Sequence, residues 1–268
     1  MLLNVHGHDA YCYTGGKTFD PSLPTAVFIH GAQNDHSVWA LQTRYFAHHG
    51  FGVLAADLPG HGRSAGAPLA NVEEMAAWLL TLLDAAGVKT ATLIGHSMGS
   101  LVALETAYLA PTRVDKLALV GTAYPMKVSE ALLDAAKNNE QLAIDMVNIW
   151  SHSSFVQKPS CPAPGFYVLG GSQRLMQRLS KLNLAPVFHT DFSACNAYAN
   201  GEIAARSVTC PALFLLGKSD LMTMPKAAGP LIKAISHAKV VQIEKCGHSL
   251  MSEQPDAVLD ALFGFAAG

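Results

Sequence analysis

Short runs of apolar and β-branched residues alternate along the chain with longer stretches in which apolar residues recur at helical spacing. The strand-like runs are Leu2–Val5, Tyr11–Thr14, Ala26–His30, Gly52–Ala56, Ala91–Gly95, Lys116–Gly121, Ala212–Gly217 and Lys239–Glu244. The helical patterns lie near 36–48, 72–86, 98–109, 225–236 and 256–266. Strands that alternate with helices of this length predict a mostly parallel sheet covered on both faces. The first two runs predict an antiparallel hairpin at one edge of that sheet.

One region interrupts the alternation. Residues 124–206 contain no strand pattern, but helical patterns lie around 128–150, 172–183 and 191–200. A segment rich in proline, cysteine and glycine, Lys158–Gly165, separates the first two. At 268 residues and 50% hydrophobic content, one domain with an insertion is favoured over two domains. We therefore predict a core made of 1–123 and 207–268, with 124–206 as a helical insertion after the sixth strand.

Charge and composition exclude several classes of function. The net charge of −2 and the absence of a basic cluster argue against binding to nucleic acid or to anionic membranes. The start of the chain lacks the charged and apolar segments of a signal peptide, and no 18-residue apolar run follows. The five scattered cysteines indicate reduced thiols and a cytoplasmic protein. None of the twelve histidines forms HxH or HExxH on a recognisable helix, so we expect neither a metal nor a cofactor.

The segment Gly95-His96-Ser97-Met98-Gly99 lies between a predicted strand and a predicted helix. Gly-x-Ser-x-Gly in this setting is the pattern of a nucleophile elbow, in which the serine occupies a sharp turn. Gly95 and Gly99 supply flanking positions without a Cβ atom. The turn would place the Ser97 hydroxyl at a helix N-terminus, where backbone N–H groups can meet a developing oxyanion. We predict that Ser97 is a catalytic nucleophile.

A serine nucleophile needs a base, and the base needs a group that orients it. In this architecture, the acid and then the histidine follow the serine along the chain. Asp220 comes after the strand Ala212–Gly217, and His248 comes after the strand Lys239–Glu244. Ligands bind at this carboxyl end of open α/β sheets. We therefore predict that His248 is the general base and that Asp220 orients it.

The oxyanion requires backbone donors. One is expected to be the N–H of Met98, next to the nucleophile, and the other the N–H of Ala32, in the loop after the strand Ala26–His30. His30 is interpreted as a support for this loop, and His96 as a packing residue. Asp57 precedes Ser97 in the chain and is interpreted as structural, pairing within its own loop with Arg63.

These residues together carry a family resemblance. The chain resembles the α/β-hydrolase superfamily over nearly its whole length, in Val27–Gly31, Asp57–Ser64, Gly95–Gly99, Gly217–Asp220, and Gly247-His248 with Glu253 and Pro255 behind it. The resemblance implies an α/β-hydrolase fold with an eight-stranded sheet and a lid over the serine. The chain looks most similar to small capped bacterial esterases and their C–C hydrolase, enol-lactonase and cofactor-free haloperoxidase relatives.

The expected reaction is hydrolysis of carboxylic esters of short to medium acyl chains through an acyl-enzyme. Epoxide hydrolases and haloalkane dehalogenases carry an aspartate where this chain has Ser97. C–C bond hydrolysis and enol-lactone hydrolysis remain alternatives, although C–C hydrolases usually have a longer Gly/Ser-rich loop after His-Gly. A small-molecule receptor with residual hydrolase activity is an alternative of another class.

The substrate is expected to be a small ester, and the oligomeric state is left open. An apolar and charge-poor pocket favours neutral substrates. Residues next to the triad and in the lid are candidates to line it, namely Tyr124, Met126, Trp150, Phe192, Leu221 and Leu250. Other lid aromatics, Phe155 and Phe166, are further candidates. Arg174 and Arg178 are one helical turn apart and could reach a substrate carboxylate, although a solvated helix face is the commoner reason for such spacing.

Overall fold

A computed structural model describes residues 1–154, 167–182 and 186–268. Its eight strands form one sheet in the order β1-β2-β4-β3-β5-β6-β7-β8. The strands are β1 Leu2–Val5, β2 His8–Tyr13, β3 Thr25–Ile29, β4 Gly52–Ala56, β5 Ala91–His96, β6 Val114–Val120, β7 Ala212–Gly217 and β8 Lys239–Ile243. β1 pairs antiparallel with β2, and β2 antiparallel with β4, while all later pairings are parallel. The predictions of a mostly parallel sheet and of an edge hairpin are confirmed.

The central strands are apolar throughout because both of their faces are covered. All five residues of β3 are buried, and successive side chains enter two different cores. Val27 and Ile29 join the core under α2 and α3, whereas Ala26 and Phe28 join the core under α1 and α11. The continuous hydrophobic runs of the sequence therefore reflect burial on two sides.

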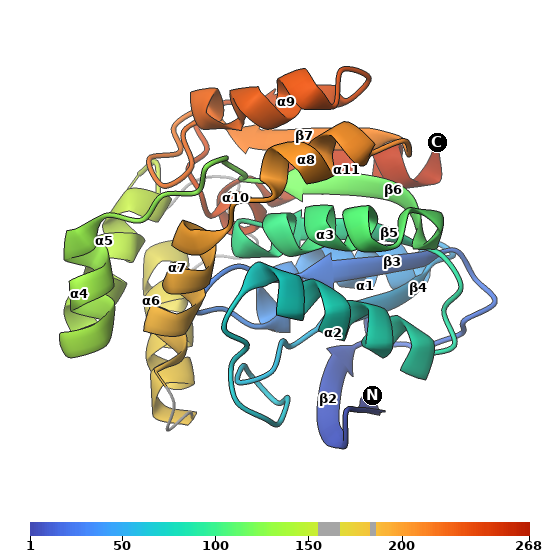
Figure 1. Cartoon of the computed structure of the whole chain (residues 1–268), viewed down its shortest axis with the longest axis horizontal. Coiled ribbons are helices and arrows are strands. Elements are labelled where there is room, and N and C mark those ends of the chain that lie inside the picture. The colour runs from blue at the N-terminus through green and yellow to red at the C-terminus, as the bar shows by residue number, and fades with distance from the viewer. Residues whose placement is uncertain (155–166, 183–185) are drawn as a thin grey trace.

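Helices cover both faces of the sheet (Figure 1). α1 (Ala40–His48) and α11 (Pro255–Ala267) pack together on one face, and α2 (Val72–Ala85) packs against α3 (Met98–Leu109) on the other. The remaining short elements outside the insertion are η1 His36–Trp39, η2 Pro111–Arg113, η3 Pro225–Ala228, α9 Gly229–Ala234 and α10 Leu250–Glu253. α2 begins where the Asn71 side chain accepts the Glu74 N–H at 2.7 Å, which is an ordinary N-cap.

The chain between β6 and β7 carries the predicted helical insertion. It contains α4 (Glu130–Asn138), α5 (Glu140–Ser151), α6 (Val168–Leu182), α7 (Val187–Ala197) and α8 (Gly201–Ser207). α4 to α7 stand on the side toward which β3, β6 and β7 point (Figure 1), whereas α8 packs against α3 and α9. Leu132, Met176, Phe188 and others form a small core within the insertion.

The insertion differs from the sequence prediction in detail. The helix expected over 128–150 is two helices, because the side chain of Asn139 caps α5 by accepting the Leu142 N–H. α6 and α7 each begin about one turn before the predicted start. The segment Lys158–Gly165 and the candidates Phe155 and Phe166 lie outside the described residues.

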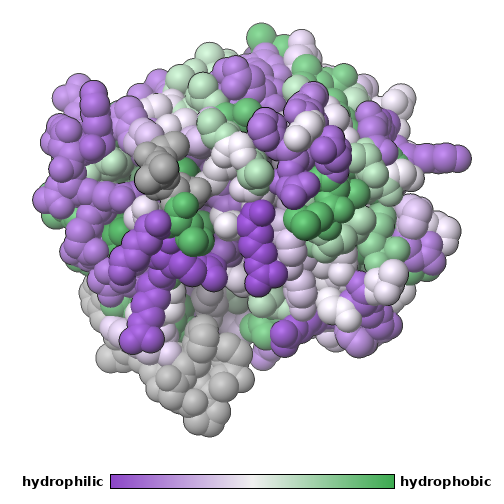
Figure 2. Space-filling model, turned by 90° about the horizontal axis from the view of Figure 1, so that it is seen from below, coloured by the Kyte–Doolittle hydropathy of each residue, from purple (hydrophilic) through white to green (hydrophobic). Residues whose placement is uncertain are grey.

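Among the described residues, none of the helices combines the length and the apolar character that crossing a membrane would require. The face shown in Figure 2 is largely hydrophilic, and hydrophobic residues reach it in separate patches. Among the described cysteines, Cys12, Cys195 and Cys210 are free thiols.

Candidate active site

Ser97 lies in the sharp turn between β5 and α3. Its backbone is in the left-handed region, with φ 53° and ψ −120°, and its N–H donates to the Val120 carbonyl at 2.9 Å. A Cβ atom on Gly95 would lie 2.0 Å from the Gly99 carbonyl oxygen, and one on Gly99 would lie 2.4 Å from the Ile29 carbonyl oxygen. The two glycines are therefore required for the turn, as the sequence pattern predicts. A non-glycine residue held at positive φ stores backbone strain, which is characteristic of functional positions.

Asp220 and His248 come from the ends of β7 and β8 and meet below the insertion. The Nδ1 atom of His248 donates to Asp220 Oδ2 at 2.8 Å, which leaves Nε2 as the proton-accepting nitrogen. The other carboxylate oxygen accepts the N–H groups of Met222 and Thr223, both at 2.8 Å. Burial alone would raise the pKa of the Asp220 carboxyl. The charge and hydrogen bond of His248, together with the backbone and side-chain hydrogen bonds of Thr223, hold this pKa below its usual value. Asp220 therefore remains a carboxylate beside the imidazole.

The loop after β3 runs beside the nucleophile. A Cβ atom on Gly31 would lie 3.1 Å from the Ser97 Cβ, so only glycine allows this approach. His30 supports the loop, because its Nδ1 donates to the Gly31 carbonyl at 2.8 Å and its Nε2 accepts the Leu58 N–H at 3.1 Å. In the described part of the chain, the N–H groups of Ala32 and Met98 donate to no protein acceptor. Ala32 also lines a cavity beside Ser97, whereas Met98 is fully buried behind the nucleophile.

Two cavities open beside Ser97. The first, here called the serine-lined cavity, measures about 300 Å³, and its polar lining includes Asn34, Ser37, Ser151, Ser172, Ser249 and Ser252. The second, here called the Trp150 cavity, measures about 370 Å³ and is lined by Met126, Val128, Leu132, Trp150, Cys195 and Leu221, among others. Both cavities share Ser97, Phe192, Met222 and His248. A ligand that reaches the Ser97 hydroxyl can therefore extend in two directions.

Four of the six predicted pocket residues, Met126, Trp150, Phe192 and Leu221, line these cavities. Tyr124 does not, because its hydroxyl turns to the Ala199 carbonyl and its ring packs against Tyr198. Leu250 does not either, because it is fully buried in the core under α1 and α11. Chain proximity to a catalytic residue does not decide which way a side chain points.

A sequence model of the alpha/beta hydrolase family matches residues 26–261. The chain belongs to this family. It is 25% identical over 246 residues to an (E)-2-((N-methylformamido)methylene)succinate hydrolase of Acinetobacter baylyi, covering 88% of both chains. It is also 25% identical to a putative esterase/lipase of Haemophilus influenzae, over 91% of this chain and 83% of that protein. The enol-lactonase of Burkholderia xenovorans has the same fold, with a TM-score of 0.81 and 23% identity over 100% of both chains.

In this alpha/beta hydrolase, His96 does more than fill space behind the elbow. Its Nε2 donates to the His248 carbonyl at 2.9 Å, and the two rings lie 4.7 Å apart. Gly121 makes room for this contact, since a Cβ there would lie 3.3 Å from His248 Nδ1 and from His96 Nε2. Burial, followed by the nearby His248, lowers the pKa of His96 to about 3. His96 therefore stays neutral and holds the backbone of the candidate base.

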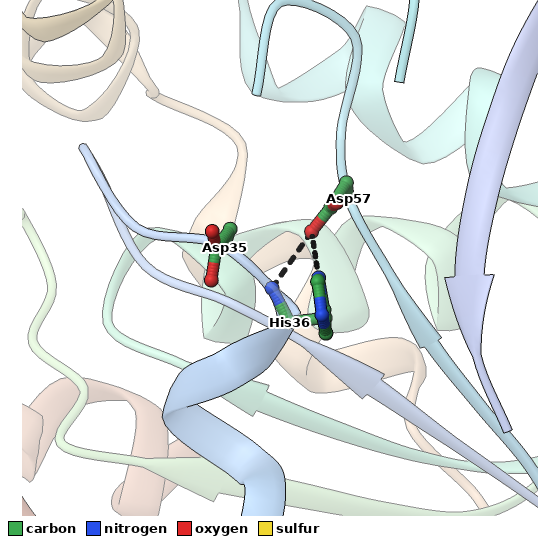
Figure 3. Close-up of side chains that lie close together, drawn as sticks. All are labelled: Asp35, His36 and Asp57. Atoms are coloured by element: carbon green, nitrogen blue, oxygen red, sulfur yellow. Dashed lines mark hydrogen bonds and ion pairs between the residues drawn. The ribbon is translucent and has the colours of Figure 1, made fainter. Parts of the chain in front are cut away.

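Asp57 contacts Arg63 within its own loop, as predicted, but it also has a second partner, His36. One oxygen accepts the His36 backbone N–H at 2.7 Å and the His36 ring Nδ1 at 2.8 Å (Figure 3). The other oxygen accepts the Arg63 backbone N–H at 2.9 Å, while the Arg63 guanidinium turns to the Tyr11 hydroxyl. The predicted contact with Arg63 therefore runs through the Arg63 backbone, and the side chain that pairs with Asp57 is that of His36.

Asp35, His36 and Asp57 are close enough to offer three ligand atoms to a metal ion (Figure 3). Their carboxylate oxygens are already used, since Asp35 accepts the Ser37 N–H and hydroxyl on one oxygen and pairs with Arg178 through the other. A cation would have to displace these donors, so the three residues fit a role in holding the loop conformation better than a role as metal ligands. Arg178 is exposed to solvent, as the sequence pattern favoured, and it also pairs with the buried Asp35.

Sequence reasoning missed several residues next to the site. Thr223 donates its hydroxyl to Asp220 Oδ2 at 2.7 Å and lies 3.0 Å from His248 Nδ1. Its position three residues after Asp220, in a polar turn, was an available signal. Gln33, His61 and Asp191 meet behind the Ala32 loop, and no local pattern links them because they lie on three distant segments.

Proposed function

We propose that the protein is a serine hydrolase that cleaves carboxylic esters of short to medium acyl chains through an acyl-enzyme. The observation that carries the proposal is the arrangement at the sheet edge. Ser97, in a strained elbow, and His248, paired with Asp220, line the same two cavities. Residues 124–206 are proposed to act as the lid over this site.

In the proposed mechanism, Ser97 Oγ attacks the ester carbonyl while His248 Nε2 takes its proton. Asp220 keeps the proton on His248 Nδ1 and stabilises the imidazolium. The oxyanion accepts hydrogen bonds from the N–H groups of Ala32 and Met98. His248 then protonates the leaving alcohol, and water repeats these steps on the acyl-enzyme to release the acid and restore Ser97.

The two cavities support a neutral ester whose halves extend in opposite directions. Among the described lining residues, Lys127 is the only lysine or arginine, and its Nζ already donates to the Asn196 carbonyl at 3.1 Å. No described aspartate or glutamate lines either cavity. A dianionic substrate would leave its carboxylates without a strong partner, which is costly in a desolvated site. Each cavity is at the small end for ligand sites, which supports short to medium chains.

The test is hydrolysis of p-nitrophenyl acetate, butyrate, octanoate and laurate by the wild type, by Ser97→Ala and by Trp150→Ala. We expect multiple turnovers with an optimum at one chain length, and a loss of about 10⁴-fold or more in Ser97→Ala. Trp150→Ala should keep its turnover and move the optimum to longer chains if the acyl group occupies the Trp150 cavity.

A folded wild-type protein that turns over none of these esters would contradict the proposal. A single stoichiometric burst of nitrophenol, without further turnover, would instead favour a receptor that is acylated once. Parallel assays with an enol-lactone and a vinylogous diketone distinguish an ester hydrolase from a lactonase and a C–C hydrolase. A higher kcat/KM on either would replace the ester as the proposed substrate.

A further inference from the structure

A fully buried junction lies behind the loop that carries Ala32. Asp191, on α7 of the insertion, places its Oδ2 atom 2.8 Å from the Gln33 backbone N–H and 2.9 Å from His61 Nε2. Gln33 follows β3 and His61 follows β4, so the junction joins two loops of the sheet to one helix of the insertion. The exposed fractions of Gln33, His61 and Asp191 are 0%, 1% and 0%.

Asp191 holds the peptide group that follows Ala32. The carbonyl of this peptide belongs to Ala32 and accepts the Asn34 side-chain amide at 3.0 Å, while its N–H belongs to Gln33 and donates to Asp191. The preceding peptide is held through the Gly31 carbonyl, which accepts from His30. The two peptides are joined at the Ala32 Cα, so a displacement of the second peptide would pull on the first and shift the Ala32 N–H with it. The same geometry excludes the Gln33 N–H as an oxyanion donor, because it is already used.

The insertion also holds Gln33 by its side chain. Gln33 Nε2 donates to the Met176 carbonyl at 3.2 Å and to the Ser180 hydroxyl at 3.0 Å, both on α6. Gln33 has φ 52°, a left-handed conformation that is uncommon for a side chain of this size. Such a conformation persists where surrounding contacts fix it, and here they come from α6 and α7.

His61 supplies the counter-charge for Asp191. Its Nδ1 lies 3.0 Å from the Pro59 carbonyl and its Nε2 faces the Asp191 carboxylate, so both nitrogens must carry hydrogens. Burial disfavours this charge, while the carboxylates of Asp191 and Asp57 and the hydrogen bond to the Pro59 carbonyl favour it. The balance raises the pKa of His61, because the charge and hydrogen bond of Asp191 outweigh the burial.

We propose that Asp191 is a positioning residue for the ester hydrolysis, which directs the Ala32 N–H toward the oxyanion by fixing the Gln33 peptide, with His61 as its counter-ion. The proposal rests on the function proposed above. It assigns the insertion a part in transition-state stabilisation as well as in enclosing the substrate. Because an oxyanion forms only after attack, loss of Asp191 should lower kcat and leave KM nearly unchanged.

The experiment compares Asp191→Ala, Asp191→Asn and a matched control, Asn196→Ala, with p-nitrophenyl butyrate as the substrate. Asn196 lies on the same helix and also accepts a backbone N–H, that of Val128 at 3.2 Å, away from the Ala32 loop. Removing one oxyanion donor costs about 10²–10³-fold in rate, so we expect a loss of about 10–100-fold in kcat for Asp191→Ala from a misdirected donor. Asp191→Asn retains an oxygen for the Gln33 N–H and should lose less, and Asn196→Ala should stay within about 3-fold of the wild type.

Two further readouts separate positioning from folding. Titration with a fluorophosphonate counts competent Ser97 sites, so that kcat is expressed per active site. Inhibition by an alkyl boronic acid, whose tetrahedral adduct occupies the oxyanion site, should weaken by the same factor as kcat/KM.

A kcat per site within about 3-fold of wild type in Asp191→Ala would overturn the proposal, as would a raised KM at unchanged kcat. If Asp191→Ala does not fold, Asp191→Asn decides, because the amide lacks the charge that pairs with His61 and shares one oxygen with the Gln33 N–H. The proposal requires a fall in both kcat and boronic acid affinity in that variant, and unchanged values would overturn it. A wild-type protein that does not hydrolyse the ester would contradict the proposed function and is distinguishable from these outcomes.

Discussion

Mild acid should destabilise this protein because His30 and His96 are buried without charge. His30 accepts the Leu58 N–H on Nε2, so a second proton there would remove that hydrogen bond. A second proton on His96 would go to Nδ1, which is buried without a hydrogen-bond partner. Burial, together with His61, lowers the pKa of His30 from 6.5 to about 4, and burial, together with His248, lowers that of His96 from 6.5 to about 3. Between pH 6.5 and these lowered pKa values, both rings take up a proton mainly when the chain unfolds.

The direction and size of the change in the free energy of unfolding follow from proton linkage. The unfolded state binds more protons than the folded state between the two sets of pKa values, so the free energy of unfolding falls as the pH falls. Each histidine removes about 1.2 kcal/mol between pH 6 and pH 5, which gives about 2.4 kcal/mol together. The result depends little on the folded values, because both lie below pH 5. Asp220, whose pKa is lowered, adds its own loss only below about its unfolded value of 3.8.

Urea unfolding of the wild type at pH 6.0 and pH 5.0 measures this difference directly. His30→Gln should reduce the loss to about 1.2 kcal/mol even if it lowers stability at both pH values, since only the pH dependence is compared. His96→Gln should do the same. A wild-type difference below about 0.5 kcal/mol, against the linkage value of about 2.4 kcal/mol, would refute the assignment of two neutral buried histidines.

Two further predictions concern the elbow and the end of the insertion. Gly99→Ala places a Cβ 2.4 Å from the Ile29 carbonyl oxygen, so we expect a loss of about 2 kcal/mol or more in the free energy of unfolding. A fluorophosphonate titration should also count fewer reactive Ser97 sites. Stability and a site count equal to those of the wild type would contradict the steric argument. Tyr198→Phe removes the 2.6 Å hydrogen bond to the buried Glu105 carboxylate, so thermal or urea unfolding should show a loss of about 1–3 kcal/mol. An unchanged stability would mean that Asn200, which also donates to Glu105, satisfies the carboxylate alone.

The local patterns of the chain predicted most of the sheet. Runs such as Gly52–Ala56 and Ala212–Gly217 match their strands residue for residue, because burial on both faces demands continuous apolar sequence. Inside the insertion the prediction was weaker. The break at Asn139 depends on one side chain that caps the second helix, and the hydrophobic pattern continues across it.

The residues predicted to line the pocket show the same limit of prediction from local sequence. Met126 and Tyr124 are two residues apart in one segment, yet Met126 lines the Trp150 cavity and Tyr124 does not. The hydroxyl of Tyr124 is held by the Ala199 carbonyl on the returning chain, 75 residues away. A contact over that separation has no signature in the surrounding sequence.

The sequence alone determined the order of strands and helices, the glycine-flanked turn at Ser97, and the positions of Asp220 and His248 at strand ends, because each depends on a few neighbouring residues and on the fixed direction of parallel strands. Only the tertiary structure decided which side chains line the two cavities, that Asp57 pairs with His36, and that Asp191 reaches Gln33 over 158 residues. These contacts form where the fold brings buried polar groups from distant segments together and excludes water, because a buried polar group is stabilised by a hydrogen-bond partner.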